Sequence, residues 1–178
     1  MKRLILFSFV ALGLFLAGCS DQSSLVGPTQ QISQQQGRTL IGLPISSLNK
    51  SIKASEKIDG AVGGTIEFEG TISDGQIKVE GKLVIPAGAF TGTRNISIKS
   101  DKATASFKFG PSGTFDKPLL FSAKISGLNL NGNNAGFVYV EQNGGLTNIA
   151  SDGSGIDNGT LYVINAELGH FSRYGWSK

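Results

Sequence analysis

Apolar and polar residues alternate along most of the chain after residue 58. The alternation is most regular over residues 65–72 and 77–85, and Ser73-Asp74-Gly75 separates these two segments. A period of two places successive side chains on opposite faces of a β-strand, so each segment would have one buried and one solvated face. Because the connection is short and rich in turn residues, we expect the two strands to pair as an antiparallel hairpin.

Further segments show the same strand pattern, with turn residues between them. They are residues 95–99, 103–109, 119–125, 136–141, 160–164 and 167–174. The intervening stretches, including residues 152–159, are rich in Gly, Pro, Asn and Asp, which favour tight turns. No segment has a sustained helical period, and 25 glycines in 178 residues agree with many turns. Short strands at this spacing predict an all-β domain, either an antiparallel β-sandwich or a barrel.

The first 18 residues follow a different pattern, that of a secretory signal peptide. Lys2 and Arg3 precede an apolar run over residues 4–16, and small residues follow it. A basic start, an apolar middle and small residues before a cleavage point are the three parts of such a signal. The run is shorter than the ~20 apolar residues that a helix needs to cross a bilayer.

The quartet Leu16-Ala17-Gly18-Cys19 resembles the lipobox of bacterial lipoproteins. The resemblance implies that the Cys19 thiol is diacylated, that the bond before Cys19 is cut, and that the new N-terminus receives a third chain such as palmitate. Two or more acyl chains anchor a protein stably to a membrane. Ser20, rather than aspartate, follows Cys19, which by analogy with enterobacterial sorting favours the outer membrane, on its periplasmic or its surface side.

An unmodified cysteine in a soluble secreted protein is the alternative interpretation of Cys19. In either case Cys19 is the only cysteine in the sequence. No intramolecular disulfide can therefore form, although an exported compartment would permit one.

Ser and Gln dominate the stretch between Cys19 and residue 58. Such a composition buries too little apolar surface to offset the entropy lost on ordering. We therefore expect residues 19–58 to form a disordered tether and residues 59–178 to form the β-domain. The apolar segment 40–45 is an exception, because it could add an edge strand or dock on the domain.

The charge balance argues against one class of partner. Without Lys2 and Arg3 the basic residues fall from 16 to 14 against 13 acidic residues, so the formal net charge falls from +3 to +1. Nucleic-acid binding thereby loses the support that a basic domain would give. The expected partners are a membrane, through the lipid on Cys19, and an envelope protein or a glycan.

Three separated motifs carry a further resemblance. They are Gly63-Gly64-Thr65-Ile66, residues 83–90 (LVIPAGAF) and residues 109–119 (FGPSGTFDKPL). Residues 83–90 resemble the IPxGA turn, and residues 109–119 the GPxGxxFxxPV segment, of the ZU-five domain, a β-sandwich found in ankyrins, netrin receptors and many bacterial envelope proteins. Residues 63–66 fit its opening strand. The resemblance spans most of residues 60–175 and implies an antiparallel, ZU-five-like β-sandwich. The same Gly and Pro residues also suit turns and edge strands of any β-fold.

The candidate chemistry lies near the C-terminus, in His170-Phe171-Ser172. In self-cleaving relatives of the ZU-five domain, and in an autoproteolytic nucleoporin, a His-Phe-Ser tripeptide is cut between Phe and Ser. The resemblance implies an acyl shift: the Ser172 hydroxyl attacks the Phe171 carbonyl, His170 accepts the proton, and water hydrolyses the resulting ester. A serine hydroxyl needs such a base, and its surroundings must hold the peptide bent.

The same tripeptide is compatible with an ordinary final strand. Residues two apart share one face of a strand, so His170 and Ser172 would lie together while Phe171 faces the core. Gly169 would loosen any clamp on the peptide. A structural strand and a single cleavage after Phe171 therefore both stay open.

Other candidate sites carry weaker signals. Residues 152–159 offer oxygen ligands like a calcium loop, but Ile156 interrupts their alternation and no bidentate Glu closes the loop, which favours a solvated loop. Glu67 and Glu69 share a strand face as a possible acid–base pair or as a solvated surface. Four strand aromatics could stack on a sugar or be half-buried: Tyr139, Tyr162, Tyr174 and Trp176.

Metal and cofactor chemistry have little support in the sequence. His170 is the only histidine, which excludes a metal site built on several His. We expect no metal and no cofactor.

Three functions from different classes follow. The first is a non-enzymatic envelope lipoprotein whose β-sandwich is a structural or interaction module. The second is the same scaffold cleaving itself once between Phe171 and Ser172, and the third is a carbohydrate-binding module. A conventional hydrolase is not favoured, because no separate Ser and Asp signature accompanies the only His.

Overall fold

The computed structural model describes residues 37–44, 51–72, 75–132 and 134–178. Within these ranges the chain forms antiparallel β-strands joined by turns and contains no helix. The described residues accordingly include no apolar helix long enough to cross a membrane. The predicted signal peptide, Cys19 and the tether up to residue 36 lie outside the described residues.

The strands are β1 (Lys53–Asp59), β2 (Gly64–Ile72), β3 (Ile77–Ile85), β4 (Thr93–Ser100), β5 (Ser106–Ser126), β6 (Gly136–Val140), β7 (Leu146–Asn148), β8 (Gly153–Asp157) and β9 (Thr160–Ser177). The predicted all-β class is confirmed. The expected hairpin is also confirmed, since β2 and β3 pair in register from Gly64 opposite Ile85 to Ile72 opposite Ile77.

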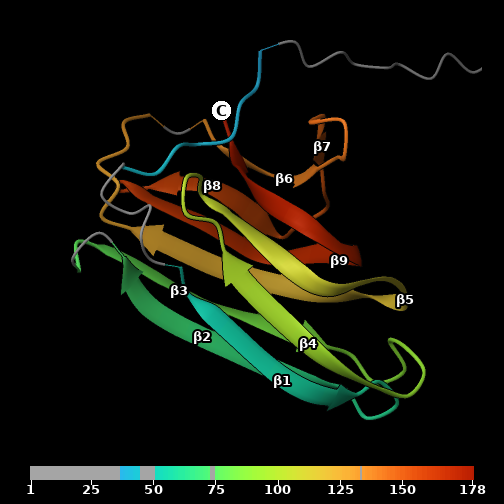
Figure 1. Ribbon diagram of the computed structural model, residues 1–178. Helices are drawn as coiled ribbons and strands as arrows, with labels where there is room; N and C mark the ends of the chain where they lie inside the picture. Colours follow the sequence, from blue (N-terminus) through green and yellow to red (C-terminus); the bar gives the residue numbers. More distant parts are fainter. Residues whose placement is uncertain (1–36, 45–50, 73–74, 133) are drawn as a thin grey trace, which may run out of the picture. The chain divides into compact units, whose positions relative to one another are not determined.

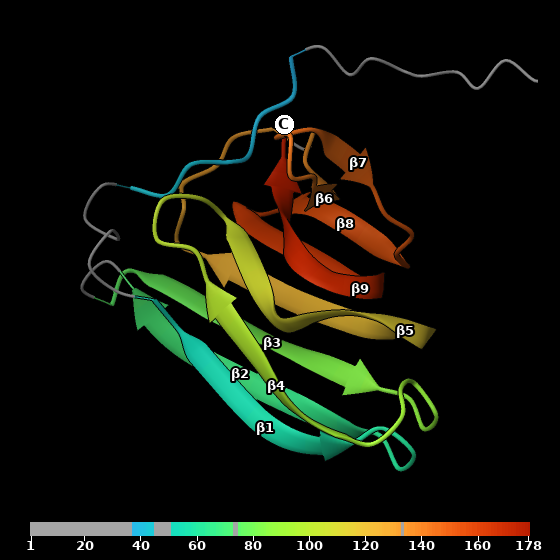
Figure 2. The same ribbon diagram turned by 45° about the vertical axis from the view of Figure 1, so that its right-hand side comes forward.

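One folded sheet is built around the two longest strands, β5 and β9. In one half the order is β1-β4-β5-β9-β6-β7, and in the other β2 pairs with β3, β3 with β5, and β8 with β9. The first part of β5 pairs with β4 and its last part with β3. Figures 1 and 2 show β5 turning back near its middle, so that the two halves of the sheet face each other.

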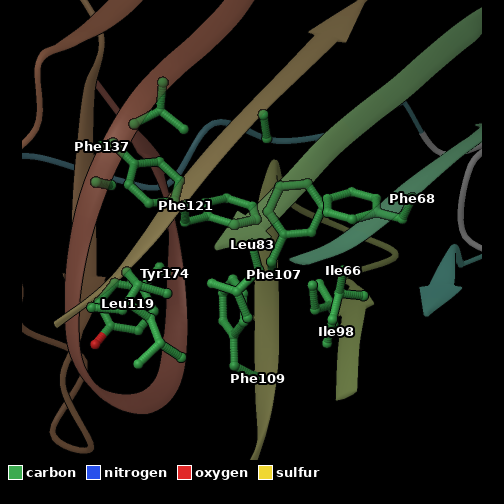
Figure 3. Packing of buried hydrophobic residues seen from close by; sticks show 14 of the residues in the cluster. Ile66, Phe68, Leu83, Ile98, Phe107, Phe109, Leu119, Phe121, Phe137 and Tyr174 are labelled. Atoms are coloured by element: carbon green, nitrogen blue, oxygen red, sulfur yellow. The ribbon is translucent and has the colours of Figure 1, made fainter. Parts of the chain in front are cut away.

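A core of aromatic and branched side chains fills the space between the two halves. Phe68 of β2 packs edge-on against Phe107 of β5, with ring centroids 5.5 Å apart, and stacks on Phe121 at 6.1 Å. Phe107 also contacts Trp176 of β9 at 6.1 Å. Figure 3 shows these phenylalanines meeting between strands of both halves. The alternating inward residues therefore converge on one shared core, as period-two patterning requires.

The β-domain begins earlier than the predicted boundary at residue 59. β1 already covers Lys53–Asp59 and pairs along its whole length with β4. Only Ile58 of this strand is buried, because β1 lies beside β4 and has no second strand partner in the described part of the chain. An edge strand with one buried side chain has too little apolar periodicity to be distinguished from a polar tether.

The segment before β1 is also part of the domain, so the predicted tether is too long at its C-terminal end. The Ile41 amide donates to the Trp176 carbonyl at 2.9 Å, and the Ile41 carbonyl accepts from the Ala105 amide at 2.8 Å. The Ile41 side chain is 2% exposed. Of the alternatives for residues 40–45, docking on the domain is the one observed for residues 40–44.

Two pairs of predicted strands are single strands that contain bulges. β5 begins at Ser106, inside the predicted strand 103–109, and continues through the predicted strand 119–125. Its register against β9 shifts between Lys108 and Gly113 and again between Thr114 and Leu119. Gly and Pro in this stretch predict a loop from the sequence, but here they belong to bulges, which bend a strand without ending it.

β9 is likewise continuous where the sequence predicts a break. Asn165 adopts a left-handed φ of 48° at the irregularity between Val163 and Ala166. The Asn165 amide donates to the Ser122 hydroxyl at 3.0 Å, and its side chain donates to Asp152 at 2.7 Å. Asn tolerates this conformation because its short polar side chain bonds locally.

Candidate functional site

His170, Phe171 and Ser172 lie where β9 passes from one half of the sheet to the other. His170 pairs with Thr114 and Phe171 with Gly113. On either side of this short pairing β5 bulges, so residues 109–112 lie opposite Ser172 and residues 115–118 opposite Gly169. The tripeptide is therefore held between two irregular stretches of the neighbouring strand.

Phe171 anchors this segment in the core. Its ring lies 4.6 Å from that of Phe115 in an edge-to-face arrangement and 5.8 Å from that of Phe109. The side chain is 5% exposed. The large buried side chains of β9 here are Leu168, Phe171, Tyr174 and Trp176. The spacing of three between the first three shows that β9 rotates about its axis instead of keeping period two.

Two tyrosines hold His170. The Tyr174 hydroxyl donates to the His170 carbonyl at 2.8 Å and lies 3.4 Å from its Nδ1 atom. The Tyr139 ring meets the imidazole edge-on at 4.7 Å. Burial raises the pKa of the Tyr174 hydroxyl, and the nearby Tyr139 adds to the rise, so Tyr174 is a neutral donor at physiological pH.

His170 and Ser172 are both half-buried, but they are not assembled as a base and a nucleophile. Among the described residues, no hydrogen bond joins the Ser172 hydroxyl to the His170 imidazole. The imidazole packs instead between Tyr139 and Tyr174. A proton transfer between the two side chains would require a rotation of at least one of them.

A hollow of about 680 Å³ opens over this segment. Its lining includes His170, Ser172, Ser112, Lys108 and Arg173. Arg173 directly follows the tripeptide in the sequence, whereas Lys108 lies on another strand and is brought beside it only by the pairing of β5 with β9. Their positive charges are the groups in this hollow that could stabilise an oxyanion.

Arg173 is fixed by a network at the turn between β4 and β5. Its guanidinium lies 3.2 Å from Asp101 Oδ2 and donates to Thr104 at 2.8 Å and to Ser106 at 3.1 Å. Asp101 in turn accepts from the Thr104 amide at 3.0 Å. This network ties β9 to the β4–β5 turn, which gives Arg173 a structural role.

The candidate carboxylate pair lies on an exposed strand face. Glu67 and Glu69 point outward from β2 beside the buried Ile66 and Phe68, as a solvated surface would. Glu67 lies opposite Lys82 in the β2–β3 pairing. The pair is accordingly part of a mixed-charge face.

The expected solvated loop over residues 152–159 is wrong, because most of it forms β8 and pairs with β9. Gly155 lies opposite Tyr162, whose ring covers the glycine. A Cβ atom added to Gly155 would lie 3.4 Å from the Cε1 atom of that ring. Only Asn158 and Gly159 turn the chain, both with positive φ. No group of three or more potential metal ligands occurs in the described ranges.

Of the four strand aromatics, Tyr139 and Tyr162 are half-buried, which is one of the two alternatives, whereas Tyr174 and Trp176 are buried in the core. Trp176 is fully buried and Tyr174 is 2% exposed, so neither ring can stack on a sugar. The Trp176 indole donates to the Tyr162 carbonyl at 2.9 Å. The sequence could not show this, because large aromatics suit a core and a binding face equally well.

A mixed-charge face covers the outside of β2, β3 and the last part of β5. The Lys78 ammonium lies 2.6 Å from Glu80, and this contact raises the pKa of Lys78 and lowers that of Glu80. Hollows of about 540 and 710 Å³ meet on this face around Glu80, Lys124 and Ile164.

Comparison with family models, curated proteins and solved structures gives no match to this chain.

Proposed function

We propose that this chain is a cell-envelope lipoprotein in which lipid on Cys19 holds a non-enzymatic interaction module at a membrane. The support for the anchor is the leader pattern and the lipobox-like quartet that ends at Cys19. In this proposal residues 1–18 are removed, and the outer membrane is the destination.

The observation that carries the module is the state of the only histidine. His170 packs between two tyrosines without a hydrogen bond to Ser172, and Phe171 between them is a core residue. Among the described residues the tripeptide therefore has a structural role at the turn of β9. Charged side chains and hollows lie on the outer faces of the sheet. Such a scaffold suits binding at a surface.

A ZU-five-like β-sandwich is the architecture we propose for this domain. The two longer motifs of the resemblance touch each other: the Asp116 amide donates to the Ala89 carbonyl at 2.8 Å, and Lys117 donates to the Ala87 carbonyl at 2.6 Å. The Phe90 and Phe115 rings lie 6.1 Å apart. A contact between segments that a family keeps as motifs supports the resemblance.

Lipidation is tested on the full chain expressed in a bacterium with an outer membrane, beside the Cys19→Ser variant. We expect the mass of the wild-type protein to correspond to a chain that starts at Cys19 and carries acyl groups. We also expect the protein to sediment with outer membranes. Cys19→Ser should keep its leader and lack acyl mass. An unmodified wild-type cysteine in the soluble fraction would refute the anchor.

Self-cleavage is the second candidate, and the irregular β9 segment under its hollow is the observation that favours it. The Ser172 hydroxyl would add to the Phe171 carbonyl, His170 would carry its proton to the departing Ser172 amide nitrogen, and water would hydrolyse the ester. The products are a Phe171 carboxylate and a free Ser172 amine.

Intact mass under denaturing conditions decides between the two candidates. Self-cleavage predicts a species ending at Phe171 after long incubation, which disappears in Ser172→Ala. Thr114→Ala is a matched control, because Thr114 pairs with His170 but takes no part in the reaction. If the wild-type chain keeps its full mass, self-cleavage is refuted and the tripeptide has a structural role alone.

A further inference from the structure

Four basic residues form a straight row across four neighbouring strands. Lys53 of β1 lies opposite Lys99 of β4, Lys99 lies opposite Lys108 of β5, and Lys108 lies opposite Arg173 of β9. Direct cross-strand partners share one face of a sheet. Lys53, Lys99 and Lys108 are exposed, so this face is the outer one. We call these four residues the basic row.

The basic row works against folding. Like charges directly opposite each other on adjacent strands are destabilising, and here the arrangement occurs at three consecutive pairings. None of Lys53, Lys99 and Lys108 forms an ion pair with a described residue. Only Arg173 is compensated, by Asp101 at 3.2 Å.

The other half of the same sheet arranges its lysines in the opposite way. Lys82 lies opposite Glu67, and Lys124 lies opposite Glu80. Lys78 contacts Glu80 at 2.6 Å. Although Glu69 lies opposite Glu80, each of these three lysines has an acidic neighbour. Lys53, Lys99 and Lys108 have basic cross-strand neighbours instead, so the row is not a general consequence of composition.

The surroundings of the basic row add positive charge and few acids. A hollow of about 320 Å³ is lined by Lys99, Lys102 and Lys108 together with Asp101. Lys57 lies on the same face of β1 as Lys53, because the two residues are four positions apart in the strand. The acids beside the row are Asp59, which accepts from the Ala61 amide, and Asp101, which is held by Arg173 and Thr104. A third acid, Glu141, lines the larger hollow with Lys108 and Arg173 and accepts a hydrogen bond from the Thr147 hydroxyl.

We propose that the basic row binds a linear anionic polysaccharide, one that carries carboxylate, sulfate or phosphate groups along its chain. Neighbouring strands are about 4.8 Å apart, so the four cations span roughly 14 Å in a line. A chain of anionic sugars presents its charges in a line, and this arrangement matches the row. The ligand is recognised by charge and not by aromatic stacking.

The composition beside the row favours a polymer over a lipid surface. The next cross-strand row on this face consists of Ser55, Ser97 and Gly110, and it is followed by Lys57 and Asn95. Surfaces that insert into a membrane combine cations with exposed apolar or aromatic side chains. These two rows offer none.

The inference deepens the proposed interaction module by naming its surface and ligand class, and it does not depend on the lipid at Cys19. The test uses the full chain in non-ionic detergent, with dextran sulfate and polygalacturonate as probes and neutral dextran as the uncharged reference. The row variant carries Lys53→Gln, Lys99→Gln and Lys108→Gln. The control carries Lys78→Gln, Lys82→Gln and Lys124→Gln, which makes the same change in net charge on the other half of the sheet.

We expect wild type and control to bind both anionic probes and not dextran, with affinity that falls as NaCl is raised. The row variant should bind about tenfold more weakly or worse, since three exposed charge contacts are lost. Thermal unfolding of the row variant should not be lowered, because the change removes repulsion.

Three results would overturn the proposal. They are equal losses in the row variant and the control, no binding of either anionic probe by the wild type, and binding of phosphatidylglycerol vesicles alone. The mass of the same sample reports whether Cys19 is lipidated, so failure of the anchor is seen separately from failure of the basic row.

Discussion

The Tyr174 hydroxyl donates a hydrogen bond of 2.8 Å to the backbone carbonyl of His170, four residues earlier in the same strand. Residues this far apart in a straight strand would be separated by more than about 12 Å, at roughly 3.3 Å per residue. The bond therefore spans the turn that β9 makes around Phe171. It also gives the half-buried carbonyl of His170 a partner at the point where the β5 register is interrupted.

Tyr174→Phe should destabilise the domain by about 1 kcal/mol, the usual net value of one intramolecular hydrogen bond. The ring stays, so its contacts with Phe109 and Phe137 are kept. Urea unfolding followed by tryptophan fluorescence measures the change, because Trp176 is buried in the same core. Tyr162→Phe is the control, since no side-chain hydrogen bond of its hydroxyl is found among the described residues.

The same residue predicts a loss of stability at alkaline pH. Burial raises the Tyr174 pKa above its ordinary value of 10.0. Above pH 10 the unfolded state therefore loses this proton before the folded state does, and stability falls as pH rises further. Between pH 9 and pH 11 the wild type should lose more unfolding free energy than Tyr174→Phe. Equal losses would show that the hydroxyl is not held neutral by the fold.

Phe171 should matter far more to stability than its neighbour Ser172. Phe171→Ala removes a buried ring packed on Phe115 and Phe109 and should destabilise the domain by about 3–5 kcal/mol. Ser172→Ala should change stability by less than about 0.5 kcal/mol, because this half-buried hydroxyl has no hydrogen-bond partner among the described residues. Chemical denaturation of the two variants side by side provides the measurement. A small effect at Phe171 would contradict the packing described for β9.

Ile41 should tie the segment before β1 to the domain. Ile41→Ala should destabilise by about 2–5 kcal/mol, because the side chain is buried beside the end of β9. Thr39→Ala is the matched control: Thr39 bonds to Lys178 through its backbone, but its side chain is exposed. Limited proteolysis should cut the Ile41 variant faster near residue 41. Equal protection of both variants would mean that the segment is held by its backbone bonds alone.

The alternating segments were predictable because the physics that places them is local. β2 and β3 each bury every second side chain, and the short turn between them leaves one register. β1 and β8 were missed for opposite reasons. β1 has a single buried residue, whereas Gly153 and Gly155 make β8 resemble a turn until Tyr162 covers them from the next strand.

The sequence predicts that the three candidate residues share one strand, but it does not predict their geometry. The sequence placed His170 and Ser172 on one strand with Phe171 in the core, and the structure has Phe171 buried. Period two cannot foresee that β9 rotates at Phe171, since the bulges responsible lie on β5. Nor can it foresee the basic row, because cross-strand register joins residues that are far apart in sequence.

The register of the basic row predicts an unusual gain in stability from one surface substitution. Lys99→Glu replaces two repulsive cross-strand pairs, with Lys53 and Lys108, by two attractive ones. Each such pair contributes roughly 0.2–1 kcal/mol, so the variant should unfold at a higher urea concentration than the wild type. Lys82→Glu makes the same change in charge opposite Glu67 and should be destabilised instead. Both effects should shrink in about 1 M NaCl, where exposed charges are screened within about 3 Å. If both variants shift in the same direction, net charge and not cross-strand register governs them, and the basic row has no energetic signature of its own.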